Sequence, residues 1–233
     1  MIRPNSCIYL VSMFPMFNER SVTPLGNIDE KHTAQLYANL FLNQKENLKP
    51  LIDYTSVLYG FDGNDREDLP AELSRAGWKN IFPNADDPNQ RIKNIADKNF
   101  GSFDCNLVIF PNSIGFSASD LKKTLDLLTI ESEAVIIGKS INGGVSFIGF
   151  NYFNQELIQE VDWSGLIYDS LLRKVNKYDN YVYVRDNSLI VNSERDFKLL
   201  YTELSKRESL SYCSQQMHEK FTHIFIEYKE LLK

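Results

Sequence analysis

The sequence predicts an α/β protein, a three-layer α/β/α sandwich with a mostly parallel central sheet, followed by an amphipathic helix at the carboxy terminus. Two observations carry this prediction. Apolar runs of strand length alternate with segments of helical periodicity through most of the first 150 residues, an order typical of α/β sandwiches. With 233 residues and 43% apolar side chains, the chain can also bury a sizeable core without disulfides or a structural metal.

The amino-terminal part begins with a strand and returns to a strand after each helix. Cys7 to Phe14 is an apolar run that we expect to be the first buried strand. Asp29 is placed to cap a helix that reaches Asn47 and keeps apolar residues at helical spacing. Further along we expect, in chain order, a strand at Tyr54–Tyr59, a helix at Leu69–Ala76, a strand at Trp78–Phe82, a helix at Arg91–Phe100, a strand at Asn106–Phe110, a helix capped by Ser117 or Ser119 and running to Leu128, and strands at Ala134–Ile137 and Ser146–Phe150.

The carboxy-terminal part adds a helix at Gly165–Asn176, a strand at Tyr181–Arg185 and a helix at Ser193–Ser205. The last segment, Gln215 to Lys233, repeats large apolar residues at spacings of three and four, which predicts an amphipathic helix. We therefore divide the chain into an α/β domain, residues 1–205, and a helical extension, residues 206–233. The extension either packs on its own domain or forms an interface, for example that of a homodimer.

Charge and composition exclude several classes of protein. The 25 basic and 31 acidic residues give a net charge of −6, the wrong sign for a broad nucleic-acid-binding surface. The apolar run after the amino terminus is too short to span a membrane and lacks a small-residue cleavage site, so we expect neither a membrane span nor a signal peptide. The three cysteines are odd in number and far apart, which favours a reducing, cytoplasmic location.

General catalytic motifs are absent from the sequence. It contains no phosphate-binding loop of the Gly-x-x-x-x-Gly-Lys type, no dinucleotide fingerprint, no His-Glu-x-x-His and no Gly-x-Ser-x-Gly. His32, His218 and His223 are too scattered for a convincing metal cluster. We therefore expect no metal and no cofactor, and assign no catalytic residue from these patterns.

Three loop segments beside apolar strands carry small or polar residues. They are Phe110 to Ser117, Ser140 to Phe150, and Ile190 to Phe197. In the second, the pair Gly143 and Gly144 fits either a plain hairpin turn or a close approach of the backbone to a ligand.

These segments resemble, over roughly residues 7 to 201, a bacterial family catalogued as domain of unknown function 2064. Its members read Gly-Ser-Asp-Cys-Pro-Gly-Leu-Thr at Phe110 to Ser117, Glu-Asp-Gly-Gly-Tyr-Tyr-Leu-Ile-Gly-Leu at Ile141 to Phe150, Pro-Trp-Ser near Asp162 to Ser164, and Asp-Val-Asp-Thr-Pro-Glu-Asp-Leu at Ile190 to Phe197. The resemblance implies the nucleotide-diphospho-sugar transferase fold, also called glycosyltransferase type A, and a nucleotide or nucleotide-sugar ligand.

The resemblance also implies a divalent cation, held by acidic residues at the strand ends, which neutralises the leaving diphosphate. This chain lacks those acids: the matching positions are Asn112, Asn142, Ile190 and Asn192. An asparagine amide can offer an oxygen but brings no negative charge, so several such replacements weaken a site for a hard dication. The resemblance therefore predicts a divergent member that has lost its metal dependence.

The first loop departs from the family as well. Two expected lysines are Met13 and Val22, whereas Arg20 is retained. A family pattern Asp-Leu-Gly-x-Arg is partly kept from Asp87 to Arg91, where the arginine either pairs with Asp87 across one helical turn or contacts a ligand. The candidate ligand-binding residues are Phe14, Arg20, Asp87, Arg91, Asn112, Asn142, Gly143, Gly144 and Trp163.

Three functions remain open from the sequence. The first is a pseudoenzyme that binds a nucleotide, a sugar or another small ligand without metal-dependent catalysis, in a cleft narrowed by bulky residues such as Phe14. The second is a metal-independent glycosyl- or nucleotidyltransferase, in which Arg20 and Arg91 stabilise phosphate and Asp87 or Asp162 acts as base. The third is a structural subunit that uses the carboxy-terminal helix. The sequence thus leaves open whether the protein is an enzyme.

Overall fold

One sheet of eight strands organises the protein. The computed structural model describes residues 5–70, 73, 79–81, 87–152 and 154–233, and within these the strand order is β3-β2-β1-β4-β7-β6-β8-β5. Four neighbouring pairs are parallel and three are antiparallel, so the sheet is mixed but mostly parallel. The strands are β1 (Ser6–Val11), β2 (Ser56–Gly60), β3 (Lys79–Ile81), β4 (Cys105–Ile109), β5 (Ser113–Ile114), β6 (Ala134–Ser140), β7 (Val145–Phe150) and β8 (Tyr181–Ile190).

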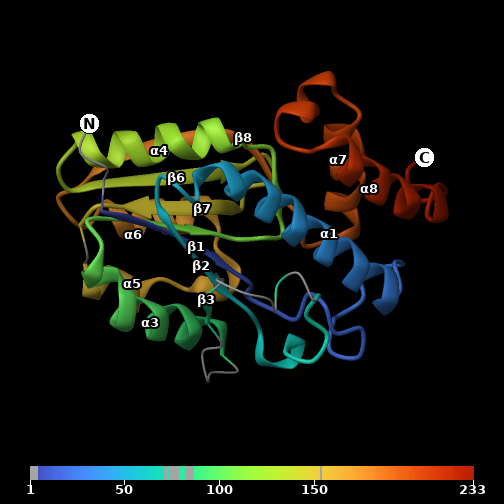
Figure 1. Ribbon diagram of the computed structural model, residues 1–233, viewed down its shortest axis with the longest axis horizontal. Coiled ribbons are helices and arrows are strands. Elements are labelled where there is room, and N and C mark those ends of the chain that lie inside the picture. The colour runs from blue at the N-terminus through green and yellow to red at the C-terminus, as the bar shows by residue number, and fades with distance from the viewer. Residues whose placement is uncertain (1–4, 71–72, 74–78, 82–86, 153) are drawn as a thin grey trace.

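Helices cover both faces of this sheet, as Figure 1 shows. One apolar cluster joins the sheet to α1 (Glu30–Leu48), α4 (Ala118–Ile130), α7 (Glu194–Leu204) and α8 (Gln215–Glu227). A second cluster, on the other face, joins it to α3 (Pro88–Asn99), α5 (Gln155–Glu160) and α6 (Tyr168–Val175). This arrangement confirms the predicted three-layer sandwich.

The first strand shows how the sequence builds two cores at once. Side chains alternate between the faces of a strand, and every residue of β1 is buried. Ile8 and Leu10 belong to the cluster beneath α1 and α4, whereas Cys7, Tyr9 and Val11 belong to the cluster beneath α3 and α5. An uninterrupted apolar run is therefore needed here, because both faces of the strand are covered.

Side-chain caps settle where the main helices begin. Asp29 caps α1 by accepting a hydrogen bond from the backbone N–H of His32, as predicted. Ser117, and not Ser119, caps α4 and forms a reciprocal capping box with Asp120. At α7 the cap is Ser193, whose side chain accepts from the backbone N–H of Asp196.

Several predicted boundaries were wrong. The first strand ends at Val11 and not at Phe14. β8 continues five residues past the predicted end at Arg185, because its far end pairs with β6 and β5. The helix expected from Gly165 begins at Tyr168, after a 3₁₀ turn. Neither α5 nor β5 was predicted, and most of the helix expected at Leu69–Ala76 lies outside the described residues.

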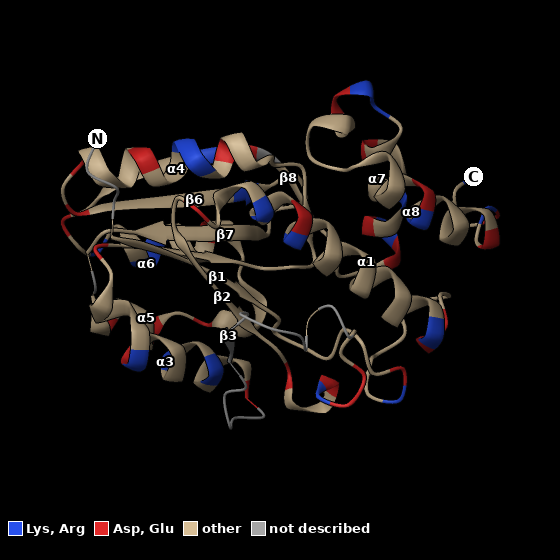
Figure 2. Ribbon diagram, viewed as in Figure 1, with Lys and Arg blue, Asp and Glu red and all other residues tan. Residues whose placement is uncertain are grey.

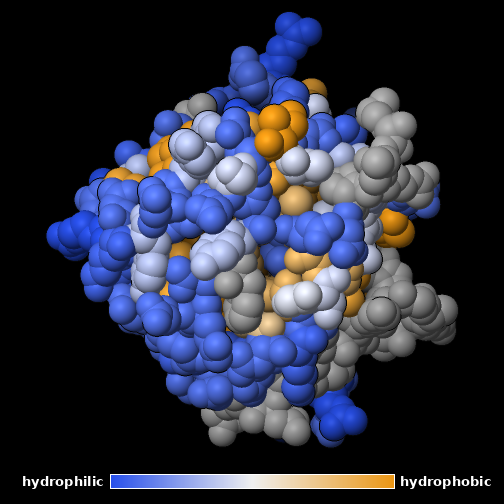
Figure 3. All heavy atoms as spheres, turned by 90° about the vertical axis from the view of Figure 1, so that its left-hand side faces the viewer, coloured by the Kyte–Doolittle hydropathy of each residue, from blue (hydrophilic) through white to orange (hydrophobic). Residues whose placement is uncertain are grey.

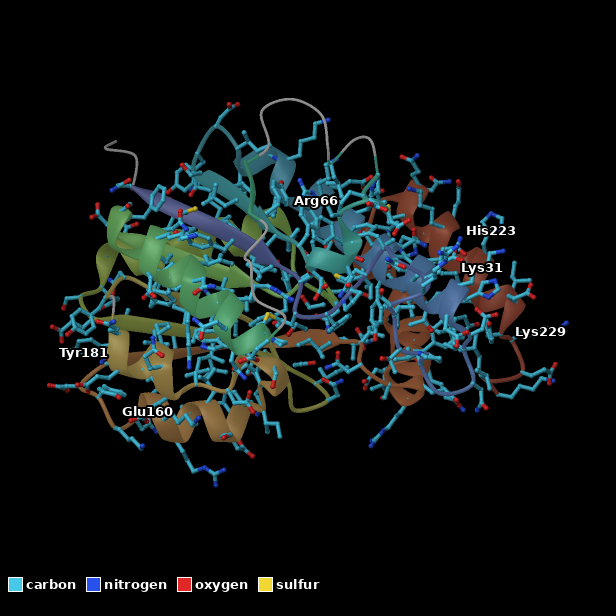
Figure 4. The ribbon with its side chains drawn as sticks, turned by 90° about the horizontal axis from the view of Figure 1, so that it is seen from below. Lys31, Arg66, Glu160, Tyr181, His223 and Lys229 are labelled. Atoms are coloured by element: carbon cyan, nitrogen blue, oxygen red, sulfur yellow. The ribbon has the colours of Figure 1, made fainter. Side chains whose placement is uncertain are left out.

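The carboxy-terminal helix packs on its own domain. α8 ends at Glu227, short of the predicted Lys233. Its buried residues Met217, Phe221, Ile224 and Phe225 belong to the same cluster as the inner face of α1. Figure 4 shows Lys31 of α1 and His223 of α8 at the same end of the molecule, far from Tyr181 of β8. The apolar face that suggested an interface is thus largely covered within the chain.

The charged residues lie on the outer helices and loops. Lysine and arginine alternate with aspartate and glutamate along α4, while the sheet is almost free of charge (Figure 2). The face at which β1 begins is mostly hydrophilic and carries only small apolar patches (Figure 3). Among the described residues, no helix is both long and apolar enough to cross a membrane.

Candidate functional site

A cavity lies at the carboxyl ends of four parallel strands. β1 runs parallel to β4, and β6 runs parallel to β8; both pairs point the same way because β7 is antiparallel to β4 and to β6. The residues that follow these four strands therefore meet at one edge of the sheet, where open α/β sheets bind their ligands. The cavity has a volume of about 810 Å³, within the range of roughly 300–1,000 Å³ typical of small-molecule sites.

The described cavity wall combines ten apolar residues with seven polar residues and three glycines. Its apolar members are Met13, Phe14, Phe110, Ile141, Val145, Trp163, Leu166, Ile167, Ile190 and Leu199; the others are Asn112, Asn142, Gly143, Gly144, Ser164, Gly165, Asn192, Ser193, Arg195 and Asp196. Six of the nine residues predicted from the sequence are among them: Phe14, Asn112, Asn142, Gly143, Gly144 and Trp163. These six residues come from four loops, which the structure brings together at this edge of the sheet.

Asn142 makes hydrogen bonds through both ends of its carboxamide. Its Oδ1 accepts from Ser140 Oγ at 2.5 Å, and its Nδ2 donates to the carbonyl of Ile190 and to Asp196 Oδ1, each at 2.7 Å. The amide therefore ties the turn between β6 and β7 to the end of β8 and the start of α7. A carboxylate at this position has no N–H to donate and would face another carboxylate.

Asp196 is the one acidic residue of the described cavity wall, and it is buried. Besides Asn142, its carboxylate accepts hydrogen bonds from the backbone N–H of Asn192 at 3.0 Å and from Ser193 Oγ at 2.8 Å. Since Ser193 Oγ in turn accepts from the backbone N–H of Asp196, the two residues form a capping pair at the start of α7. Both carboxylate oxygens are thus used within the protein.

Asn112 joins the loop after β4 to the loop after β8. Its Nδ2 donates to Asn192 Oδ1 at 2.7 Å and to the carbonyl of Val191 at 3.4 Å. Asn112 is buried, whereas Asn192 is exposed. The two amides thus pair with each other at positions where the resemblance places two carboxylates, an arrangement that needs no cation between them.

The double glycine forms a tight turn that also faces the cavity. Gly143 has a φ of +86°, in the left-handed region that favours glycine. Its N–H donates to the carbonyl of Ser140, and the N–H of Ser140 donates to the carbonyl of Gly144. A side-chain atom at Gly144 would touch Ile190 at ordinary contact distance. The hairpin explanation is therefore sufficient for Gly143, and both residues border the cavity.

Phe14 and Trp163, two aromatic residues of the cavity wall, are each held by contacts within the protein. Phe14 packs against Tyr37 of α1 with the ring centres 4.7 Å apart. Burial, together with the charge of nearby Asp196, raises the pKa of Tyr37, so its hydroxyl stays protonated. Trp163 is buried and donates its indole N–H to the carbonyl of Ile158. These rings are held in place before any ligand arrives.

A carboxylate fixes the loop that presents Met13 and Phe14. The backbone N–H groups of Met16, Phe17 and Asn18 all donate to the buried carboxylate of Asp65, at 2.8–3.0 Å. Successive backbone N–H groups that converge in this way form an anion-binding concavity. Here the anion is supplied by the chain itself.

The remaining three predicted residues do not border the cavity. Arg91 is buried; it donates from Nη2 to Asp62 Oδ2 at 2.5 Å and from Nη1 to the carbonyl of Ser12 at 2.8 Å. The pairing of Arg91 with Asp87 considered from the sequence was therefore wrong: the partner is Asp62, and Asp87 caps α3. Arg20 is exposed on the first loop, outside the cavity wall.

The two acids considered as catalytic bases are helix caps. Asp87 accepts from the backbone N–H of Asn89. Asp162 accepts from Asn89 Nδ2 and from both the N–H and the hydroxyl of Ser164, and these hydrogen bonds lower its pKa. Neither residue is part of the described cavity wall.

The donor set does not fit a divalent cation. Mg²⁺ and Mn²⁺ prefer several oxygen ligands, usually with more than one carboxylate. Among its described residues the cavity wall has a single carboxylate, Asp196, which already accepts from three donors. Within the described part of the chain, no three His, Cys, Asp or Glu side chains converge closely enough to hold a metal ion.

One basic residue of the cavity wall was not predicted from the sequence. Arg195 borders the cavity and is exposed, yet it was not among the predicted residues. The signal was present in the late motif, in which Arg195 occupies the position of the family's glutamate. Ile141 and Ile167, exposed apolar residues of the wall, were also missed, because neither lies in a pattern that periodicity can single out.

Comparison with known proteins identifies the fold. No family model and no curated protein matches the sequence, so membership in the resembled family stays a prediction. Among solved structures, a candidate nucleotide-diphospho-sugar transferase from Desulfovibrio desulfuricans G20 is 20% identical, with 98% of this chain and 97% of that chain covered and a TM-score of 0.73.

More distant structures have the same architecture. A 4-diphosphocytidyl-2C-methyl-D-erythritol synthase from Anaerococcus prevotii DSM 20548 is 10% identical over 96% of this chain and 97% of that chain, with a TM-score of 0.51. Rv0371c from Mycobacterium tuberculosis H37Rv, solved in complex with manganese, is 9% identical over 86% of this chain and 98% of that chain, with a TM-score of 0.50. At these identities the likeness establishes architecture alone, and the chain has the nucleotide-diphospho-sugar transferase fold.

Proposed function

We propose that the protein binds a nucleotide or nucleotide sugar in this cavity without a divalent cation, as a degenerate relative of the transferases whose fold it has. The hydrogen bond between Asn142 and Asp196 carries the proposal. It occupies the one carboxylate of the described cavity wall and places an amide where a second carboxylate would be needed. The cavity is nonetheless large and open to ligands.

The mixed wall supports a ligand of this class. Phe14 offers a rigid aromatic surface, which suits a base or a sugar ring. The three cysteines are buried and form no disulfide, which agrees with the expected reducing location, the cytoplasm.

Metal-independent transfer is the weaker alternative. Asp87 and Asp162 act as helix caps outside the described cavity wall. Arg91 forms a buried ion pair with Asp62. None of these three residues borders the described cavity, and neither does Arg20. A purely structural role is equally unsupported, since α8 buries its apolar face in its own domain.

Thermal shift and product analysis test the proposal together. We expect at least one of UDP-glucose, GDP-mannose and CDP-glucose to raise the melting temperature equally in EDTA and in MnCl₂, with no turnover. A shift that requires manganese, or release of sugar or diphosphate, would contradict the proposal.

A matched pair of variants shows whether the ligand occupies this cavity. Ile167→Trp fills the cavity at its exposed wall, whereas Ile130→Trp enlarges an exposed isoleucine on α4, away from it. The first variant is expected to lose the ligand-induced shift and the second to keep it. If both variants keep the shift, the ligand binds elsewhere.

A further inference from the structure

The hydrogen bonds inside the cavity leave few polar groups free for a ligand. Asn142 uses both ends of its carboxamide. The side chain of Ser193 bonds to Asp196, which also accepts from Asn142 and from the backbone N–H of Asn192. These groups stabilise the cavity wall and have few hydrogen-bonding positions left for a ligand.

Arg195 is different. It is an exposed member of the cavity wall, and within the described ranges its guanidinium has no ion pair or hydrogen bond. The acidic neighbours on either side in the sequence are engaged elsewhere: Glu194 accepts from Asn27, and Asp196 from Asn142. Arg195 is also the one lysine or arginine in the described wall.

Asn192 adds a second free donor beside it. Asn192 Oδ1 accepts from Asn112 Nδ2 at 2.7 Å, which fixes the carboxamide so that its Nδ2 faces away from Asn112. In the described part of the chain this Nδ2 has no acceptor. Asn192 and Arg195 both border the cavity at the start of α7, so an amide and a guanidinium are left to donate at one place.

We propose that Arg195, assisted by the Nδ2 amide of Asn192, directly binds an anionic group of the ligand, a phosphate or diphosphate, and so takes over the charge-neutralising task of a dication. The inference rests on the proposed function, because it assigns the chemistry of that same cavity. A guanidinium suits this task, since its planar N–H donors match two phosphate oxygens at once. The charge that the carboxylates and a cation would supply together is here supplied by one side chain.

Binding measurements with and without the phosphate test the assignment. Titrations in EDTA use UDP-glucose, glucose 1-phosphate, inorganic phosphate and uridine. Arg195→Ala is expected to lower the affinity for UDP-glucose by at least about tenfold, because a charge-assisted hydrogen bond to the phosphate is lost. Uridine, which lacks phosphate, is expected to bind both proteins equally. Arg195→Lys keeps the positive charge but loses the planar guanidinium. Its affinity for UDP-glucose should therefore lie between those of wild type and Arg195→Ala.

Controls separate this inference from the proposed function. Arg207→Ala removes an exposed arginine outside the cavity wall and should leave every affinity unchanged. The affinity of wild type for UDP-glucose should fall with added salt, and that dependence should be smaller in Arg195→Ala. Equal UDP-glucose affinity in wild type and Arg195→Ala overturns the inference while sparing the proposed function. If no nucleotide sugar binds wild type, the proposed function fails. The role of Arg195 is then tested by the affinities of wild type and Arg195→Ala for glucose 1-phosphate and inorganic phosphate, and equal affinities overturn the inference.

Discussion

Asn142 donates a hydrogen bond from Nδ2 to Oδ1 of Asp196 at 2.7 Å, and this contact joins the turn after β6 to the first turn of α7. In a metal site, two carboxylates at these positions would be held together by a cation between them. In this protein an amide and a carboxylate are held together directly. This hydrogen bond therefore stabilises the wall of the cavity without a cation.

Restoring the acid should therefore destabilise the protein. Asn142→Asp removes the N–H donor and sets a second carboxylate against buried Asp196, which we expect to lower the free energy of unfolding by about 1–3 kcal/mol at neutral pH. Protonation of one of the two carboxylates removes the repulsion between them, so the stability of the variant should recover as the pH falls. Urea unfolding between pH 5 and pH 8 measures both effects.

The control is Asn94→Asp, at an asparagine of α3 whose oxygen accepts from Gln90. It adds the same charge without loss of a donor contact to an acid, and it should change stability little at any pH in that range. A loss as large as that of Asn142→Asp would mean that net charge, and not the contact with Asp196, is responsible.

The buried ion pair below the first loop predicts a larger effect. Arg91→Ala leaves the carboxylate of Asp62 buried without its partner and frees the carbonyl of Ser12, a change worth about 3–5 kcal/mol in the free energy of unfolding. The double variant Arg91→Met with Asp62→Asn removes the stranded charge and should be more stable than Arg91→Ala. Chemical denaturation measures the free energy of unfolding of both variants. Equal losses of stability would show that the carboxylate of Asp62 can be buried without its arginine partner at no cost.

The carboxy-terminal helix should be required for folding. Phe221 is fully buried between α8 and the core, so Phe221→Ala is expected to cost about 3–5 kcal/mol. Ile226 lies five residues further along the same helix and is 63% exposed; its replacement by alanine should lower the free energy of unfolding by less than about 0.5 kcal/mol. Urea denaturation distinguishes the two variants. Similar, small losses in both would contradict the packing of α8 in the core.

Protonation of His218 should lower the stability of the protein in acid. Burial lowers the pKa of His218 below its ordinary 6.5, and its Nε2 lies 3.0 Å from Ser209 Oγ. The unfolded chain therefore binds the proton first, and stability falls as the pH drops from 6.5 towards the folded pKa. His218→Gln should remove this part of the pH dependence of the melting temperature. An unchanged slope would assign it to other groups.

The sequence predicted the architecture well because apolar runs and helix caps are local features. The run from Cys7 and the caps Asp29 and Ser117 have the expected roles. Alternation of helices and strands then places the ends of parallel strands together, which is why six candidate residues proved to border one cavity.

Contacts between distant segments escaped prediction. Arg91 pairs with Asp62, a residue on another loop, because the end of β2 brings that loop beside α3; only the three-dimensional fold decides this choice over Asp87. The importance of Arg195 likewise depends on knowing that its neighbours Glu194 and Asp196 are already engaged. Sequence spacing alone carries no information about such competition.

The affinity for a nucleotide sugar with and without a divalent cation is the most direct test of the account. Titration of wild type with UDP-glucose, GDP-mannose and CDP-glucose in EDTA and again in MnCl₂ should give, for any ligand that binds, the same dissociation constant in both buffers. An affinity at least about tenfold higher in MnCl₂, a gain of about 1.4 kcal/mol, would show that the cavity holds a cation and would contradict the account.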